Sequence, residues 1–297
     1  MDKMRLVDWL RRERDQRVGG GLYYNTQILF AYNSNHMEGS TLSPEQTAQL
    51  YDTGALLPDN GNDQIRADDV VETRNHFLAF NWILDHADEP VDKTMVCALH
   101  AMLKRGTSQE LDPDRNVGGY KVLPNVINQV LGVHTALPAD VPQAMEQVFA
   151  LYRDLRDDPY GIAEAHWMFE TTHPFSDGNG RIGRLVMFKE LLRLDTVPVI
   201  VRDSNRNLYV RGLSRFGEEP GYLVDTLLTE RDYYEALMGQ FAPDRIRYSY
   251  VSAWDSTEVA ERRGGRPMSN PFVKREWSET DIHARIRRER SDGVEKA

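Results

Sequence analysis

The sequence contains a single cysteine, Cys97, among 297 residues. One thiol excludes an internal disulfide framework and a metal site built from several cysteines. A His-Glu-x-x-His pattern or comparable spacing is also missing, so a zinc site built on histidines is not expected. The chemistry of this chain must therefore come from other side chains.

Long apolar runs are missing too, because no stretch approaches the length of a membrane span. Residues 1–12 are charged throughout and lack the apolar core of a signal peptide, so we expect a cytoplasmic protein without a membrane partner. The formal charge of −10 and the pI of about 5.3 argue against nucleic acid as a partner. An apolar content of 40% is enough for one sizeable core.

Helical patterns dominate the sequence. Ser43 before Pro44 is a strong start signal, because serine caps free N–H groups and proline suits the first helical position. Apolar spacing and breaker residues predict helices over residues 3–16, 23–37, 44–54, 65–86, 92–104, 142–156, 160–172, 181–194, 206–216 and 219–238. We expect N-terminal helices over 1–60, a main domain over 61–240 and a charged extension over 241–297.

Glycine and proline residues interrupt the helical pattern between residues 112 and 138. Residues 120–123 and 126–131 have the composition of extended strands. We therefore predict a small β-hairpin over 118–131, which makes the fold class mainly α with one hairpin.

The most informative segment is His173-Pro-Phe-Ser-Asp-Gly-Asn-Gly-Arg-Ile-Gly-Arg184. Its glycine turn can direct successive backbone N–H groups toward one point, and the apolar run that follows predicts a helix N-terminus there. Free N–H groups and the helix dipole favour phosphate at such a place. His173 ends the preceding helix, where an imidazole that is largely neutral at pH 7 can act as a general base.

This segment resembles the signature of the Fic family, His-x-Phe-x-(Asp/Glu)-Gly-Asn-Gly-Arg-x-x-Arg, at every specified position. The family joins an AMP group from ATP to a hydroxyl side chain of a target protein. The resemblance therefore implies a protein adenylyltransferase with a Fic-type helical fold and a small hairpin flap. It also implies ATP and Mg²⁺, and a protein partner that offers a Tyr, Thr or Ser hydroxyl.

The resemblance assigns a role to each motif residue. His173 would take the hydroxyl proton, and Asp177 would hold Mg²⁺, which commonly takes one protein carboxylate together with phosphates and waters. Arg184 would contact the γ-phosphate. The residues expected around the other phosphates are Gly178, Asn179, Gly180 and Arg181.

Two further stretches resemble the family more weakly. Tyr120, Lys121 and Val122 fall where the flap would align a target segment by backbone hydrogen bonds, with lysine in place of the usual arginine. A plain surface hairpin is the alternative. Tyr209 and Leu213 resemble residues that line an adenine pocket, although their spacing is also typical of a helix face in a core.

Ser34-Asn-His-Met-Glu38-Gly39 resembles the family's inhibitory motif, (Ser/Thr)-x-x-x-Glu-(Gly/Asn). Its position before the active-site motif is typical of the self-inhibited N-terminal subclass, class II. A Glu38 carboxylate that met Arg184 would form a charge-assisted pair and occupy the guanidinium intended for the γ-phosphate. A solvated helix face is the alternative interpretation.

Three function classes remain. The first is AMP transfer restrained by Glu38, and the second is another transfer on the same fold (phosphoryl, uridylyl or phosphocholine) or removal of AMP. The third is a non-catalytic helical scaffold. Gly178 favours AMP over phosphoryl transfer, because the phosphorylating relatives resemble a variant with lysine at that position. Since some relatives dimerise or modify themselves, a homodimer and auto-AMPylation are further expectations.

Overall fold

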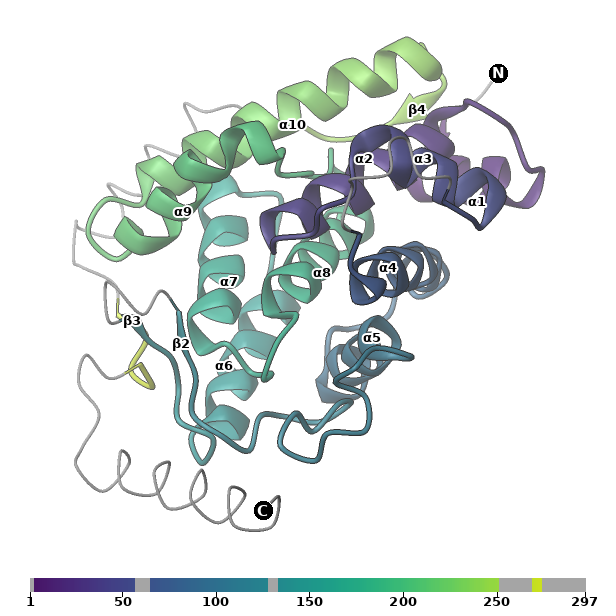
Figure 1. Ribbon diagram of the computed structural model, residues 1–297. Helices are drawn as coiled ribbons and strands as arrows, with labels where there is room; N and C mark the ends of the chain where they lie inside the picture. Colours follow the sequence, from purple (N-terminus) through teal and green to yellow (C-terminus); the bar gives the residue numbers. More distant parts are fainter. Residues whose placement is uncertain (1–2, 57–64, 128–132, 251–268, 274–297) are drawn as a thin grey trace.

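The computed structural model describes residues 3–56, 65–127, 133–250 and 269–273. In these ranges helices dominate and surround a central helix, α8, as Figure 1 shows. The helices are α1 (Leu6–Asp15), α2 (Leu22–Met37), α3 (Pro44–Thr53), α4 (Ala67–Asp85), α5 (Lys93–Lys104), α6 (Val141–Arg153), α7 (Pro159–Thr172), α8 (Asn179–Arg193), α9 (Arg206–Arg215) and α10 (Gly221–Phe241). A short 3₁₀ helix, Asp203–Asn205, precedes α9. The mainly α prediction is confirmed.

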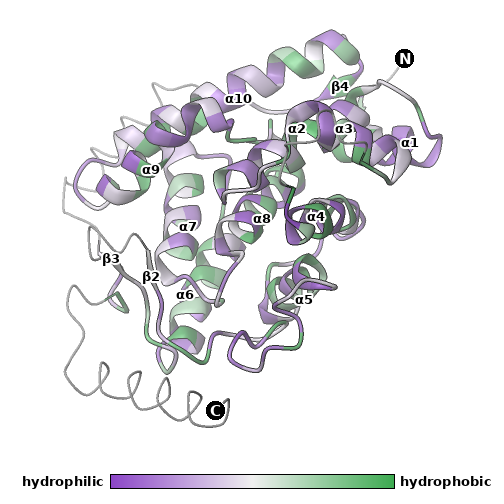
Figure 2. Ribbon diagram, viewed as in Figure 1, coloured by the Kyte–Doolittle hydropathy of each residue, from purple (hydrophilic) through white to green (hydrophobic). Residues whose placement is uncertain are grey.

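Helix α8 is buried from Asn179 to Leu192 and contacts α2, α4, α5 and α7. A helix covered on all sides has no solvent face, so its apolar residues fall all around it. Figure 2 shows that hydrophilic positions are mixed among them. Burial on every side fixes the position of the N-terminus of α8, which is where the glycine turn lies.

Local signals set the helix ends that the sequence predicted. The Ser43 hydroxyl accepts from the Gln46 N–H at 3.1 Å, while the Gln46 side chain accepts from the Ser43 N–H at 3.0 Å. This reciprocal cap and Pro44 begin α3, and Gly54, with a φ of 68°, ends it. The Asp92 carboxylate likewise caps α5 by accepting from the Met95 N–H at 2.8 Å.

The first predicted helix is wrong at its start. Met4–Arg5 forms strand β1, which pairs in parallel with β4, Ile246–Arg247, and α1 begins only at Leu6. The segment just after residue 240 is therefore paired with the N-terminal segment. The domain boundaries stay a prediction, and the loop expected over 55–62 lies partly outside the described residues.

The predicted hairpin exists but is displaced along the chain. Its strands are β2 (Val126–Ile127) and β3 (Val133–His134), which pair antiparallel with Val126 opposite His134. Residues 120–123, expected as the first strand, are not part of a strand, and Val122 and Leu123 lie in a bend before Pro124. The turn of the hairpin lies outside the described residues.

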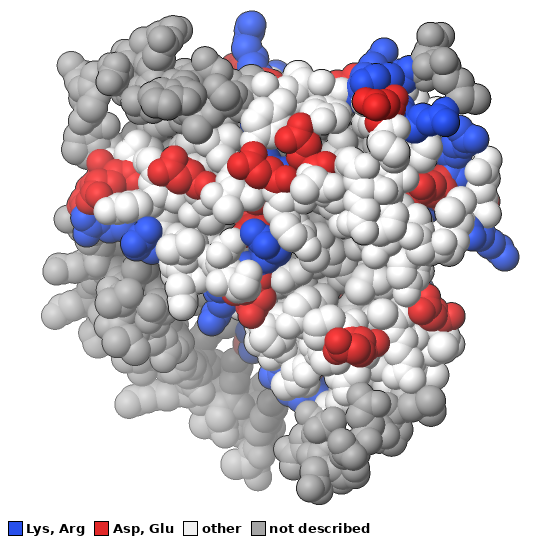
Figure 3. All heavy atoms as spheres, turned by 90° about the horizontal axis from the view of Figure 1, so that it is seen from above, with Lys and Arg blue, Asp and Glu red and all other residues white. Residues whose placement is uncertain are grey.

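Two surface properties can be followed in the described ranges. No helix there combines the length and the apolar character that a membrane span needs. Figure 3 shows acidic and basic side chains interspersed on the face seen from above, with no single basic patch.

Candidate functional site

The site begins where α7 ends. His173 adopts a left-handed backbone conformation with φ of 52°, and its N–H donates to the Phe169 carbonyl at 3.0 Å. A non-glycine residue in this conformation is uncommon, and Pro174 then prevents the helix from continuing. The Phe175 ring is fully buried and stacks on His100 with ring centroids 4.2 Å apart, so the loop is anchored in the core as expected.

The half-buried His173 ring has the tautomer that a base needs. Its Nδ1 lies 3.3 Å from the Glu170 carbonyl oxygen, which can only accept, so Nδ1 carries the proton and Nε2 keeps its lone pair. Burial lowers the pKa of His173 to about 4, and the Lys121 ammonium contributes in the same direction. The imidazole is therefore neutral at pH 7.

The glycine turn leads directly into α8. Gly178 has a φ of 78° and precedes the helix, and the Ile182 N–H is the first to bond within it, to the Gly178 carbonyl at 3.0 Å. The N–H groups of residues 179–181 consequently have no acceptor within the helix, which makes an anion site. The Asn179 side chain faces inward instead. It donates to the Phe175 carbonyl at 2.9 Å and accepts from the Phe175 N–H at 2.8 Å, so only its backbone is available to a ligand.

The Glu38 carboxylate lies against Gly180, beside this anion site. A Cβ placed on Gly180 would lie 2.1 Å from Glu38 Oε1, so only glycine admits the carboxylate there. Glu38 Oε1 accepts from Arg184 Nη2 at 2.7 Å. Arg184 also donates through Nε to the Ser34 hydroxyl at 3.1 Å and through Nη2 to the Ser34 carbonyl at 2.8 Å. Gly39, with a φ of 90°, provides the turn after α2.

The electrostatics of this pair favour the charged form of both partners. Burial pushes the pKa of Glu38 upward, but the Arg184 and Arg181 guanidiniums outweigh it and hold that pKa below its ordinary value. Burial likewise opposes the charge on Arg184, and the Glu38 carboxylate raises the pKa of Arg184 overall. The sequence predicted that these residues meet, and the structure places them in contact.

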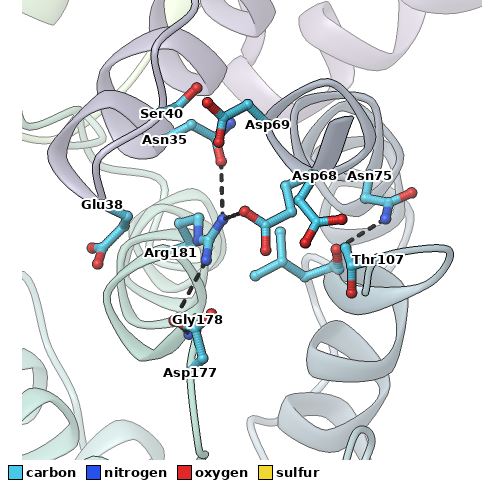
Figure 4. Close-up of polar contacts among 12 residues, drawn as sticks. Asn35, Glu38, Ser40, Asp68, Asp69, Asn75, Thr107, Asp177, Gly178 and Arg181 are labelled. Atoms are coloured by element: carbon cyan, nitrogen blue, oxygen red, sulfur yellow. Dashed lines mark hydrogen bonds and ion pairs between the residues drawn. The ribbon is translucent and has the colours of Figure 1, made fainter. Parts of the chain in front are cut away.

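Asp177 and Arg181 belong to a second group of charges beside the turn. Arg181 lies between Asn35 and Asp177, as Figure 4 shows. Its Nη1 is 3.5 Å from Asn35 Oδ1, and its Nη2 is 3.7 Å from Asp177 Oδ1. Arg181 Nη1 also donates to Glu72, and Lys104 donates to both Glu72 and Asp177. Although burial raises the pKa of Asp177, Lys104 and Arg181 lower it overall, so the carboxylate is ionised.

Sequence reasoning missed Lys104 and Glu72. Lys104 is the last residue of a predicted helix and Glu72 lies in another, so neither belongs to a motif with a defined spacing. The only sequence signal was one charge of each sign near the ends of neighbouring helices. Among the described residues, no group of three or more His, Cys, Asp or Glu side chains could hold a metal ion.

A pocket of about 440 Å³ opens on this side of the turn. Its walls include Glu38, Glu72, Gln109, Asp177 and Arg181, so both charge groups border the same cavity. His173 is not part of its lining.

The flap residues depart from expectation. Lys121 is only 2% exposed, so its side chain is not available to a target, and a docking role for this segment through its backbone stays a prediction. Its Nζ donates to Asn125 Oδ1 and Thr135 Oγ1, both at 2.7 Å, and its backbone N–H donates to the Pro174 carbonyl at 2.8 Å. These bonds join residue 121 to the catalytic loop. Val122 is 38% exposed and Tyr120 is half-buried.

The expected adenine residues lie in α9. Tyr209 is 3% exposed, and its hydroxyl is 2.7 Å from His166 Nε2. Leu213 is half-buried against the core, and its carbonyl accepts from Trp167 Nε1 at 3.1 Å. This is the core arrangement that their spacing also allowed, and a role for them in binding adenine stays a prediction.

Comparison with known proteins agrees with this geometry. Residues 90–191 match the family model described as the Fic/DOC family, so this part of the chain is similar to Fic/DOC domains. A crystal structure of a Fic-domain-containing signalling protein from Bacteroides thetaiotaomicron has a TM-score of 0.61 at 22% identity, covering 79% of this chain and 93% of that one. A Fic family protein from Desulfovibrio desulfuricans has a TM-score of 0.58 at 20% identity, covering 94% and 81%. These similarities show the fold.

Curated relatives are named protein adenylyltransferases. The protein adenylyltransferase Fic of Nematostella vectensis is 27% identical over 192 residues, which cover 62% of this chain and 42% of that protein. The protein adenylyltransferase fic-1 of Caenorhabditis elegans is 26% identical over 199 residues, which cover 63% and 36%. This chain therefore spans less than half the length of these two relatives.

Proposed function

We propose that this protein transfers AMP from ATP to a hydroxyl side chain of a protein, and that Glu38 restrains the reaction. The observation that carries the proposal is that the Glu38 carboxylate lies against Gly180 at the start of α8 and is paired with Arg184. An anion therefore lies beside the expected phosphate site, and a neutral imidazole with a free Nε2 ends the helix before it. The names of the curated relatives support the same chemistry.

The reaction would use these groups in the following way. The hydroxyl oxygen of the target attacks the α-phosphorus of ATP as its proton moves to His173 Nε2. The bond from that phosphorus to the oxygen bridging the α- and β-phosphates breaks, and pyrophosphate leaves. The N–H groups at the start of α8 and Arg181 would stabilise the charge that develops on the phosphates.

Asp177 suits a magnesium ligand in part. Its carboxylate is ionised and its side chain is 37% exposed beside the pocket, as a metal that keeps phosphates and waters requires. Its Oδ2, however, accepts from Lys104. A bound Mg²⁺ would supply positive charge to the leaving pyrophosphate.

The restraint follows from geometry. Arg184 is 2% exposed, and its Nε and Nη2 groups donate to Ser34 and Glu38, so these two donor groups are not available to a γ-phosphate. ATP would have to displace Glu38 or bind with its phosphates misplaced. Removal of the carboxylate should therefore release activity.

Auto-modification gives a test that needs no knowledge of the target. Wild type, Glu38→Gly and Glu38→Gly/His173→Ala proteins are incubated with ATP labelled at the α-phosphate. We expect strong labelling in Glu38→Gly, weak labelling in wild type and none in the double variant. Equal, robust labelling of wild type and Glu38→Gly would refute the restraint, and labelling that survives in the double variant would refute His173 as the base.

Mass spectrometry of the same Glu38→Gly protein, incubated in cell lysate, distinguishes the alternatives. An AMP adduct on Ser, Thr or Tyr supports AMP transfer, and a phosphoryl or uridylyl adduct would move the proposal to another transfer on this fold. No adduct on any protein would favour a scaffold, whereas loss of AMP from a previously modified protein would indicate removal.

A further inference from the structure

The expected metal ligand already has a cation bound to it. Lys104 is fully buried, and its Nζ donates to Asp177 Oδ2 and to Glu72 Oε1, the latter at 2.5 Å. Gln109 Nε2 donates to the same Asp177 oxygen at 3.1 Å. The other oxygen, Oδ1, accepts from the Gly178 N–H at 2.7 Å. Both oxygens therefore have partners, and the Lys104 ammonium lies at Oδ2.

Four side chains close a ring of alternating charge. Lys104 contacts Asp177, Asp177 lies 3.7 Å from Arg181, Arg181 contacts Glu72, and Glu72 returns to Lys104. Two cations and two carboxylates balance, so their mutual attraction offsets part of the cost of removing them from water. The ring joins α4, α5 and the start of α8, so it fixes Asp177 before any ligand arrives.

A divalent metal cannot simply be added to this arrangement. Mg²⁺ binds carboxylate oxygens at about 2.0–2.1 Å, and an ammonium on the same oxygen would lie against the metal with like charge. If the Lys104 ammonium leaves Asp177, it still has Glu72 as a carboxylate partner, because Glu72 already accepts from it. Metal binding at Asp177 therefore requires Lys104 to give up one carboxylate and keep the other.

We propose that Lys104 is a built-in competitor of the divalent metal at Asp177, which holds the carboxylate in place without metal and weakens metal binding. This rests on the proposed function only in that Asp177 faces the phosphates of a bound nucleotide. Glu72 has the opposite effect, because it draws Lys104 and Arg181 away from Asp177.

The test measures how much the metal strengthens nucleotide binding, without any transfer step. In the Glu38→Gly protein, calorimetry gives the Kd of α,β-methylene-ATP with Mg²⁺ and with EDTA. The metal effect is the Kd with EDTA divided by the Kd with Mg²⁺, so a larger ratio means that the metal strengthens nucleotide binding more. Lys104→Met should raise this ratio about tenfold, as expected from losing one charge-assisted contact. Glu72→Gln should lower it, because both cations then have Asp177 as their remaining carboxylate in the ring.

Competition predicts that the metal effect rises in Lys104→Met and falls in Glu72→Gln. General damage to the site would instead weaken the metal effect in both variants. Gln109→Leu is the matched control, since it removes a neutral contact to the same oxygen and should change the ratio less than about twofold. A Lys104→Met ratio that is unchanged or lower would overturn the proposal. Asp177→Asn should abolish the metal effect; if it does not, Asp177 is not the ligand and the inference fails. Absence of nucleotide binding in every variant would refute the proposed function itself.

Discussion

Glu38→Gln is the most informative single substitution, because it keeps the size of the side chain and removes its charge. The Arg184 side chain is 3% exposed and that of Glu38 is 31% exposed. Removal of one partner from a fully buried ion pair costs about 3–5 kcal/mol. The exposed edge of Glu38 and the two bonds from Arg184 to Ser34 reduce this loss, so we expect about 1–2 kcal/mol. The nucleotide-free Tm should fall by about 2–8 °C, at about 2–4 °C per kcal/mol.

The same change should strengthen ATP binding. Arg184 becomes available to a phosphate, and a hydrogen bond to a charged group contributes about 1.5–3 kcal/mol, which is a Kd lower by about tenfold to a hundredfold. Scanning calorimetry and isothermal titration of the same protein preparation measure both effects. A variant with unchanged Tm and unchanged ATP affinity would refute the reasoning.

Ser34→Ala is the matched control for this prediction. It removes the hydroxyl that accepts from Arg184 Nε at 3.1 Å but leaves the Ser34 carbonyl and the Glu38 pair. We expect a loss of less than about 1 kcal/mol and no gain in ATP affinity. If Ser34→Ala matched Glu38→Gln in both measurements, the charge of Glu38 would not be the cause.

Two more predictions concern the loop. Because the pKa of His173 is lowered to about 4, the base stays neutral in mild acid, and transfer by Glu38→Gly should decline only as the pH approaches that value. Lys121→Met removes a positive neighbour of His173, so the pKa of His173 and the pH at which the rate declines in acid should both rise. A decline at an unchanged pH would contradict this.

Asn179→Ala removes both hydrogen bonds to the Phe175 backbone and should lower the free energy of unfolding by about 1–3 kcal/mol, as chemical denaturation measures, with loss of labelling. Full labelling would show that the loop does not need these bonds.

The parts of the site that could be predicted from the sequence are those whose structure depends on residues close together in the chain. The glycine turn, the proline after His173 and the helix that follows each depend on local backbone preferences, so motif and structure agree there. Contact between Glu38 and Arg184 joins α2 to α8, and it was foreseen from a resemblance and not from spacing. Local rules alone would have left Glu38 on a solvated helix face.

The parts that were missed depend on tertiary contacts. Strands of two residues have no periodicity, so neither the β1–β4 pair nor the displaced hairpin could be located from composition. The burial of Lys121 has no signal in the sequence, because a lysine between a tyrosine and a valine gives no sign of the oxygens around it. Lys104 was missed for the same reason, since its carboxylate partners lie 32 and 73 residues away in the sequence.

The most direct measurement of the central claim is a crystal structure of Glu38→Gly bound to Mg²⁺ and α,β-methylene-ATP. Phosphate oxygens should lie at the N–H groups of residues 179–181, next to the space against Gly180 that the Glu38 carboxylate fills, with Arg184 turned to the γ-phosphate and His173 Nε2 directed at the open side of the α-phosphorus. A nucleotide bound elsewhere while the start of α8 stays empty, or an imidazole turned into the core, would contradict the account.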